Sequence, residues 1–412
     1  MTGGRLSRRS ALGLIGAAGA VGVTGGFAAG AARDDDAEPQ ESVVPFHGKH
    51  QAGITTRVQQ HLYFASFDMT STATREDLKS LLADWTAAAA RLTQGRAVTA
   101  EGATGGGPYK PPDDTGEALG LEPNALTITF GFGPALFAAD RFGLEKKRPK
   151  ELVELPSFAF ELLEDRFSGG DLCIQACADD PQVAVHAIRN LSRIAFGRAQ
   201  VRWTQLGYGR TSTTSKSQST PRNLFGFKDG TANVFSNDDS DLATWVWADG
   251  SDQPWLAGGS FLVARKIQML IESWDRVRLE EQEAIVGRDK GRGAPLSGGS
   301  EFTEPDFDVV STAARGPAIP MDSHVRLAHP TQNGGARMLR RGYNYVEGNN
   351  DLGQLNAGLF FLVFVRSPEQ FIGVQRSLAK DSLNEYIRHI GSAIFAVPGG
   401  IRAGESIGSG LF

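Results

Sequence analysis

The sequence predicts an α+β fold made of two ferredoxin-like domains, of the dimeric α+β barrel type, in which antiparallel sheets are flanked by helices. The order strand, helix, long insertion, strand, helix occurs twice along the 412 residues and approaches the order of that fold. A composition of 41% hydrophobic and 22% charged residues is ordinary for a globular chain. At 211–220, eight of ten residues are Ser or Thr, which indicates a linker or long surface loop between domains at 56–210 and 221–412.

The elements of the first half follow from the spacing of its apolar residues. Alternation indicates strands, whereas apolar residues three and four apart, such as Leu78, Leu81 and Trp85, indicate a helix. The stretch 94–124 is rich in Gly and Pro and should be a long loop. We expect strands at 60–68, 125–132, 172–178 and 200–206, and helices at 74–92 and 181–196.

The second half repeats this pattern around a glycine-rich insertion at 287–308. A closing strand is clear only in the first half. We expect strands at 260–267, 336–345 and 359–365, and helices at 269–286 and 368–379.

Residues 1–32 indicate an export signal that is not part of the fold. Ser7-Arg8-Arg9-Ser10 precedes a mildly apolar stretch, and Ala29-Gly30-Ala31 is a small-residue cleavage site. A disordered basic N-terminus is the alternative. The pattern predicts a secreted or extracytoplasmic protein that uses the twin-arginine pathway, with residues 33–55 as a flexible leader.

Charge and hydropathy exclude two kinds of partner. The formal net charge is −5 and the body of the chain has no basic cluster, so we expect no nucleic acid. The apolar run at 358–365 is too short to span a bilayer, so we expect no membrane span. Cys173 and Cys177 lie about 13 Å apart on a predicted strand, too far for a disulfide, and we expect both to be buried.

A carboxylate stands between glycines in Gly226-Phe227-Lys228-Asp229-Gly230. Flanking glycines let the chain lie close against a ligand. On its own, however, an Asp-Gly pair is more often only a turn.

His324 lies in the first turn of a predicted short helix that Asp322 or Ser323 can cap and Pro330 ends. Such a histidine can project one ring nitrogen into a cavity. Most single histidines are instead surface residues or satisfied by neighbours.

Arg340 and Arg341 lie on a predicted strand and should therefore point to opposite faces. One of them can enter a pocket while the other faces solvent or a carboxylate. Two solvated arginines are the alternative.

Together, three of these residues suit the cleavage of hydrogen peroxide at a haem. Asp229 can act as general base and then acid. Arg340 can stabilise the developing negative charge with donors that stay protonated. His324 can hold the iron from the opposite face.

The chain resembles the dye-decolorizing peroxidases, and within them the exported, deferrochelatase-like branch. The resemblance covers essentially everything after residue 50. It is carried by segments in the family's order: Gly226–Gly230, Gly287-Arg288, Gly293–Leu296, Asp322–Pro330, Met338–Tyr343 and Gly391–Gly399.

The resemblance implies a haem b beside the sheet of the C-terminal half, with His324 as the axial iron ligand and Asp229 and Arg340 on the distal side. Leu359 and Phe361 are implied as an apolar wall, and Glu385 as the acceptor for the second nitrogen of His324. The remaining implied cofactor contacts are Gly230, Thr231, Ala232, Pro330 and His329, the last of which replaces an Asn common in relatives.

The implied activity is that of a haem-dependent peroxidase, which reduces hydrogen peroxide and oxidises bulky aromatic, dye-type or other reductants, small or macromolecular. Electrons from bulky donors would cross the protein through aromatic residues, with Tyr343 and Tyr345 as the first candidates. One alternative is a haem-handling protein that releases iron from haem in iron acquisition. Another is a binding module that keeps the fold without haem.

Overall fold

Nine strands of the described residues form one sheet that closes on itself. The computed structural model describes residues 42–229, 231–311 and 316–412; the predicted export signal and Gly230 lie outside these ranges. Its sheet strands are β1 (His61–Met69), β2 (Thr127–Phe132), β3 (Leu172–Ala178), β4 (Ala199–Arg210), β5 (Ser260–Met269), β8 (Leu339–Arg340), β9 (Tyr343–Asn349), β10 (Leu355–Val365) and β11 (Ile387–Val397). In the described residues the order is β5-β11-β2-β3-β1-β4-β9-β10-β8, and β5 also pairs with β10, which closes a barrel.

Each half of the chain supplies four of the barrel strands in the same spatial order. The first half gives β4-β1-β3-β2 and the second gives β11-β5-β10-β9, all neighbours being antiparallel. The halves meet where β4 pairs with β9 and where β2 pairs with β11. This arrangement confirms the predicted duplicated ferredoxin-like fold. It also supplies β11 as the closing strand that patterning left unclear in the second half.

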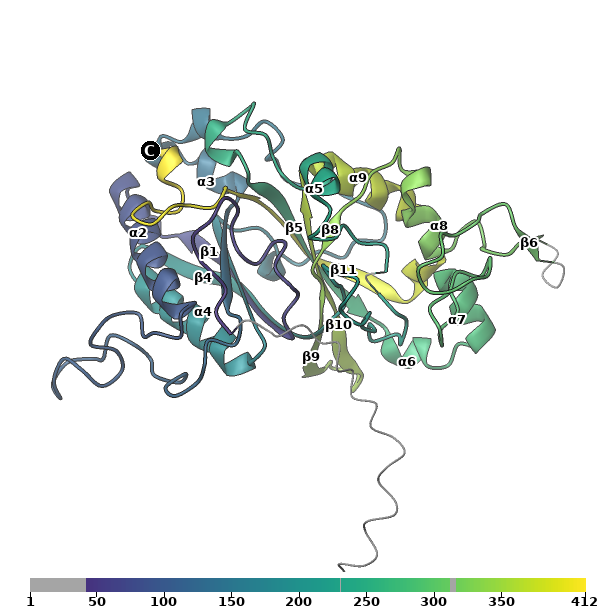
Figure 1. The fold of residues 1–412 in the computed structure, drawn as a ribbon, viewed down its shortest axis with the longest axis horizontal. Coiled ribbons are helices and arrows are strands. Elements are labelled where there is room, and N and C mark those ends of the chain that lie inside the picture. The colour runs from purple at the N-terminus through teal and green to yellow at the C-terminus, as the bar shows by residue number, and fades with distance from the viewer. Residues whose placement is uncertain (1–41, 230, 312–315) are drawn as a thin grey trace, which may run out of the picture. The chain divides into compact units, whose positions relative to one another are not determined.

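Two helices cover the outer face of the first-half strands (Figure 1). They are α2 (Arg75–Leu92) and α4 (Pro181–Ala195), which begin at the capping residues Thr74 and Asp180. Their apolar faces pack on β1, β2 and β3 in the largest core cluster. The indole of Trp85 also donates to the carbonyl of Leu191 at 2.8 Å, which joins the two helices. Each fully buried leucine in this layer stabilises the fold by about 1.5–3 kcal/mol.

The helices of the second half are shorter and depart from the pattern in one place. The predicted helix at 269–286 is broken into α6 (Ile271–Trp274) and α7 (Leu279–Val286). The side chain of Gln282 donates to the carbonyls of Trp274 and Val277, which satisfies backbone groups freed by the break. The remaining elements are α3 (Pro134–Ala138), α5 (Asp239–Trp245), α8 (His324–Ala328), α9 (Pro368–Ser377) and the small pair β6 (Val310–Ser311) and β7 (Gly316–Pro317).

The predicted strand at 336–345 is also interrupted. It consists of β8 and β9, with Arg341 and Gly342 between them. A Cβ on Gly342 would come within 2.6 Å of the Thr211 hydroxyl, so only glycine fits where the chain crosses from one strand to the other.

The inside of the barrel holds a second apolar cluster that includes both cysteines. Cys173 and Cys177 are free and buried, as expected, and they share this cluster with Phe64, Phe360 and Phe395.

The Ser/Thr-rich stretch 211–220 is a loop, as its composition predicts; most of residues 215–220 are at least partly exposed, but its first four residues are buried. Residues Thr211 to Thr214 are at most 3% exposed. Their polar groups are used internally: the Thr214 hydroxyl donates to the carbonyl of Thr56, and the N–H of Thr211 donates to the carbonyl of Gly342. Small hydroxyl side chains suit this position because they can hydrogen-bond to backbone groups and occupy little volume.

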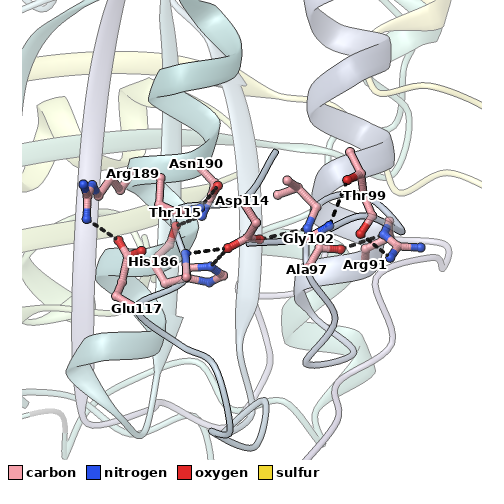
Figure 2. A network of polar contacts seen from close by, with 12 residues as sticks. Arg91, Ala97, Thr99, Gly102, Asp114, Thr115, Glu117, His186, Arg189 and Asn190 are labelled. Atoms are coloured by element: carbon pink, nitrogen blue, oxygen red, sulfur yellow. Dashed lines mark hydrogen bonds and ion pairs between the residues drawn. The ribbon is translucent and has the colours of Figure 1, made fainter. Parts of the chain in front are cut away.

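The long loop at 94–124 is held on α2 and α4 by a polar network (Figure 2). Asp114 is 2% exposed; its Oδ1 lies 2.8 Å from Nε2 of His186, and its Oδ2 accepts from the N–H of Val98 at 3.0 Å. Burial alone would raise the pKa of Asp114, but hydrogen bonds from His186, Val98 and Gly116 outweigh burial and lower it. The side chain of Asn190 binds Thr115 beside it.

No helix in the described part of the chain is both long and apolar enough to cross a membrane.

Candidate active site

A tight turn sets the direction of Asp229. Gly226 has a φ of +82°, a left-handed conformation that favours glycine, and a Cβ there would approach Cε of Lys290 to 2.8 Å. The N–H of Gly226 donates to the carbonyl of Asn223 at 2.9 Å, and the N–H of Asp229 donates to the carbonyl of Pro221 at 3.0 Å. The glycine therefore permits the turn that carries the carboxylate.

Asp229 and Arg340 form an ion pair across 111 positions of the chain. Oδ1 of Asp229 lies 3.0 Å from Nη1 of Arg340, and the two side chains are 21% and 23% exposed. Both charged groups are therefore mostly buried but still accessible to water. The structure brings together the two residues that the sequence placed on the distal side.

The loop that carries Asp229 also holds the backbone of Arg340. Asn233, 1% exposed, accepts from the N–H of Arg340 at 2.7 Å and donates to its carbonyl at 3.0 Å and to the carbonyl of Thr213 at 2.7 Å. The carbonyl of Ala232 accepts from Nη2 of Arg340 at 3.3 Å. Ala232 itself is exposed.

Arg341 points away from this site, as the strand pattern predicts, but it does not face solvent or a carboxylate. It is fully buried. Its guanidinium donates to the carbonyls of Ile54 and Thr56 and, at 2.7 Å, to Oε1 of Gln59. Arg341 therefore fastens the segment before β1 to the strands of the second half.

His324 is the first residue of α8, directly after the N-cap Ser323. Its Nδ1 lies 2.6 Å from Oδ2 of Asp381. The Asp381 side chain is 2% exposed, whereas that of His324 is 37% exposed. The other carboxylate oxygen, Oδ1, accepts from the N–H of Leu383 at 2.8 Å, so Asp381 holds the ring in place while Nε2 stays available.

Asp381, and not Glu385 as expected, is the partner of the second ring nitrogen of His324. Both residues belong to one short turn, Ser382–Glu385 with Asp381 as its N-cap. Asp381 turns inward and Glu385 is exposed. The expectation for Glu385 is therefore wrong, because the capping residue of the turn faces α8 and its last residue does not.

The pKa of His324 depends on its charged neighbours. Burial would lower the pKa of His324, but the charge and hydrogen bond of Asp381 raise it above its ordinary value. The carboxylate of Asp229 adds to the rise and Arg340 opposes it. Of these three residues, Asp381 is the one in direct contact with the ring.

His329 lies just beyond α8 and is 8% exposed. Its Nδ1 is 2.9 Å from the hydroxyl of Thr331, and its Nε2 is 2.9 Å from Oε1 of Glu304. The ring also meets that of Phe307 edge-on at 5.0 Å. Pro330 follows it and begins a short 3₁₀ turn, Pro330–Gln332. Both nitrogens of His329 thus have protein partners.

A segment that we call the bridging segment, residues 301–307, connects the two sides of the site. At one end, Glu301 forms an ion pair with Lys228, and its Oε1 lies 3.3 Å from the hydroxyl of Thr231. Lys228 and Thr231 flank Asp229 in the sequence. At the other end, Glu304 and Phe307 contact His329. The bridging segment is part of the glycine-rich insertion predicted at 287–308, and it connects the Asp229 loop to the residues after His324.

Leu359 and Phe361 lie on the same face of β10 as Val363, the residue paired with Arg340. Leu359 packs with Phe225, Phe227 and Trp274 in an apolar cluster. Phe361 lies 6.4 Å from Phe371 of α9, measured between ring centroids. Both side chains remain partly exposed, so the strand offers an apolar wall next to the charged pair.

This set of side chains fits a haem. A single imidazole with a free Nε2, fixed from behind by a carboxylate, is the ligand that a porphyrin iron takes from a protein. The apolar wall suits the macrocycle, and the Asp229–Arg340 pair supplies polar groups on the other side. Among the described residues no group of three or more His, Cys, Asp or Glu side chains could hold a metal ion directly.

The tyrosines that the sequence favoured as electron relays are enclosed in the barrel. Tyr343 and Tyr345 are at most 1% exposed. Burial raises the pKa of both phenols. Tyr386 differs: it is only partly buried, and its ring meets Trp274 edge-on at 5.2 Å.

Two residues of the site, Asp381 and Asn233, were not predicted from the sequence. Asp381 sits in an ordinary turn, and nothing local distinguishes it from Glu385. Asn233 could have been noticed because it lies four positions after Asp229 in the same turn-rich run. Its partners, however, are backbone groups that no side-chain pattern reveals.

Comparison with known proteins places these observations in a family. The family model described as Dyp-type peroxidase, N-terminal, matches residues 51–209, and the model described as Dyp-type peroxidase, C-terminal, matches residues 220–402. A deferrochelatase of Escherichia coli (strain K12) is 38% identical over 375 residues, which is 89% of this chain and 86% of the relative.

Solved structures agree. The oxyferrous/water mixed complex of DtpA from Streptomyces lividans superposes with a TM-score of 0.82 at 39% identity, covering 90% of this chain and 97% of the other. A DyP-type peroxidase from Cellulomonas bogoriensis gives 0.80 at 38% identity, with 91% and 99% covered.

Proposed function

The chain belongs to the Dyp-type peroxidase family, and on that premise we propose that His324, Asp229 and Arg340 form its active site. As a member of this family it is a haem-dependent peroxidase, an oxidoreductase that acts on peroxide. One observation carries the assignment of the site: Asp229 and Arg340, the two residues expected on the distal side, form an ion pair 3.0 Å long.

His324 would hold the iron of haem b through Nε2, the nitrogen that Asp381 does not bind. When bound, haem supplies the oxidation and reduction chemistry that peroxide cleavage requires. Leu359 and Phe361 form the apolar wall beside the macrocycle. Thr231, Ala232, His329 and Pro330 line its edge. His329 already binds Glu304, so a haem carboxylate would approach it in competition with that side chain.

Asp229 moves one proton. It takes the proton from one oxygen of hydrogen peroxide and returns it to the other, so that the second oxygen leaves as water. The N–H···O bond to Pro221 and the ion pair with Arg340 hold the carboxylate in the direction needed.

Arg340 stabilises the negative charge that develops as the O–O bond breaks. Arg340 is held by hydrogen bonds at both its side chain and its backbone. Donors held in advance lose little free energy to reorganisation during the reaction.

Asp381 orients His324. A carboxylate hydrogen-bonded to the second nitrogen fixes the tautomer of a ligand histidine and makes it a stronger donor. Electron donors return the enzyme to its resting state, and we propose that these donors are dye-type aromatics or other small or macromolecular reductants.

The absorption spectrum of the purified protein tests this function. The protein should show a Soret band that shifts on addition of one equivalent of hydrogen peroxide and returns when a dye is oxidised. A haem-loaded protein whose spectrum ignores peroxide would contradict the assignment.

A second candidate function is favoured by the relatives named deferrochelatase: release of iron from haem, with two protons taking its place on the porphyrin nitrogens. Incubation of the protein with haem should then produce the fluorescence of metal-free porphyrin. Peroxidase activity alone leaves that fluorescence absent, so one measurement separates the two functions.

We also propose export through the twin-arginine pathway, on the basis of Arg8-Arg9 and the apolar stretch after them. Replacement of both arginines by lysine should leave the protein in the cytoplasmic fraction. Unchanged appearance outside the cytoplasm would contradict this proposal.

A further inference from the structure

Asn233 holds Arg340 by its main chain. Oδ1 accepts from the N–H of Arg340 at 2.7 Å, and Nδ2 donates to the carbonyl of the same residue at 3.0 Å. Together these bonds fix both polar groups of one peptide residue. β8 contains only Leu339 and Arg340, so the strand itself provides little to hold Arg340 in register.

The same loop holds the side chain of Arg340. Asp229 binds Nη1 at 3.0 Å and the carbonyl of Ala232 accepts from Nη2 at 3.3 Å. Asp229, Ala232 and Asn233, which lie within five positions of one loop, therefore bind both the backbone and the guanidinium of Arg340. Any shift of the backbone would change the distance between the charged group and the carboxylate.

Asn233 also ties this arrangement to the buried segment behind it. Its Nδ2 donates to the carbonyl of Thr213 at 2.7 Å, and Thr213 is 3% exposed. Both the donor and the acceptor atoms of the amide are engaged, and the side chain is 1% exposed. An asparagine is required here because one side chain must accept from an N–H and donate to two carbonyls.

We propose that Asn233 is a positioning residue for the peroxide step: it sets the distance and direction between Arg340 and Asp229. This inference rests on the proposed roles of those two residues. It does not require Asn233 to touch peroxide or haem. Loss of this grip should misplace Arg340 while leaving its charge intact.

The expected effect is selective. Asn233→Ala should lower kcat/KM for hydrogen peroxide about 10- to 100-fold, because small misplacements of a reacting group cost this much. The constant for the electron donor should stay unchanged, since that step does not use Arg340. Asn233→Ser, which keeps one hydrogen bond, should show a smaller loss and serves if the alanine variant does not fold.

Asn190 provides a matched control. It is also 1% exposed, and its amide likewise accepts from one backbone N–H and makes two donor bonds, to the Thr115 hydroxyl and the His186 carbonyl. It lies in the network around the 94–124 loop (Figure 2). Asn190→Ala should lower the unfolding temperature as much as Asn233→Ala and leave the peroxide constant unchanged.

A double-mutant cycle with Arg340→Leu decides the matter. If Asn233 acts through Arg340, adding Asn233→Ala to Arg340→Leu should reduce the peroxide constant no further. Additive losses, or a peroxide constant unchanged in Asn233→Ala, would overturn the inference while leaving the proposed function intact. A normal peroxide constant in Arg340→Leu itself would instead refute the proposed role of Arg340, and the positioning role with it.

Discussion

Asp381 accepts a hydrogen bond from Nδ1 of His324 across 57 positions of the chain, with 2.6 Å between the two atoms. The carboxylate is almost completely buried. A buried anion on the far nitrogen of a ligand histidine strengthens its donation to a metal.

Asp381→Asn should therefore weaken the bond between His324 and haem iron. We expect haem affinity to fall about 10- to 100-fold. The reduction potential of the ferric protein should rise, because the variant loses negative charge that stabilises the ferric state. Haem titration and redox titration measure the two effects. Glu385→Gln is the control: this exposed residue should have no influence on either, and an equal effect would return the role to Glu385.

Asp229→Asn should retain haem and lose the fast reaction with peroxide. The amide cannot take up a proton, so the transfer between the peroxide oxygens must rely on solvent, and the rate should fall about 100- to 10,000-fold. Stopped-flow absorption at the Soret band measures it.

Arg340→Leu should slow the same step about 100- to 1,000-fold by removing the charge beside the breaking bond. Haem binding should remain, because the proposed iron ligand is His324 and not Arg340. Peroxide kinetics that stay normal in both variants would show that the distal site lies elsewhere.

The bridging segment should control how long haem stays bound. Glu304 is 82% exposed in its contact with His329, whereas Glu301 is 12% exposed beside Lys228. Even a fully charged pair contributes only about 0–1 kcal/mol at such an exposed position, so Glu304→Gln should raise the rate of haem loss no more than about fivefold. Glu301→Gln should raise it further. Transfer of haem to apomyoglobin measures both rates, and equal or unchanged rates would show that the segment does not restrain the cofactor.

The buried carboxylate in the first half gives a pH-dependent prediction. The pKa of Asp114 is lowered in the folded state, so its ionised form stabilises the fold above the unfolded value of about 3.9. This contribution is lost as the pH falls through the folded pKa. Asp114→Asn should lower the free energy of unfolding by about 1–3 kcal/mol at neutral pH, with a smaller difference below pH about 4.

Asp113→Asn is the matched control for that experiment. Asp113 makes one exposed hydrogen bond, to the hydroxyl of Thr99 at 2.9 Å. Its replacement should change unfolding little at any pH. A destabilisation by Asp114→Asn that is the same at pH 3 and pH 7 would contradict the role of the ionised carboxylate.

Signals carried by contiguous residues predicted the secondary structure well. The period of apolar residues located α2 and α4 closely because each helix buries one face, and it located β3 and β5, which are short runs buried almost throughout. It failed at 269–286, where the predicted helix is broken into α6 and α7.

The sequence alone determined the duplicated fold, because strand and helix periods are written in contiguous residues, and its short motifs were enough to propose Asp229, His324 and Arg340 as site residues. Only the tertiary structure decided which partners these residues have. Asp381 rather than Glu385 meets His324, Arg341 is buried rather than solvated, and Asn233 grips Arg340 through the main chain. These choices depend on the direction of side chains across distant elements, and no local period encodes that direction.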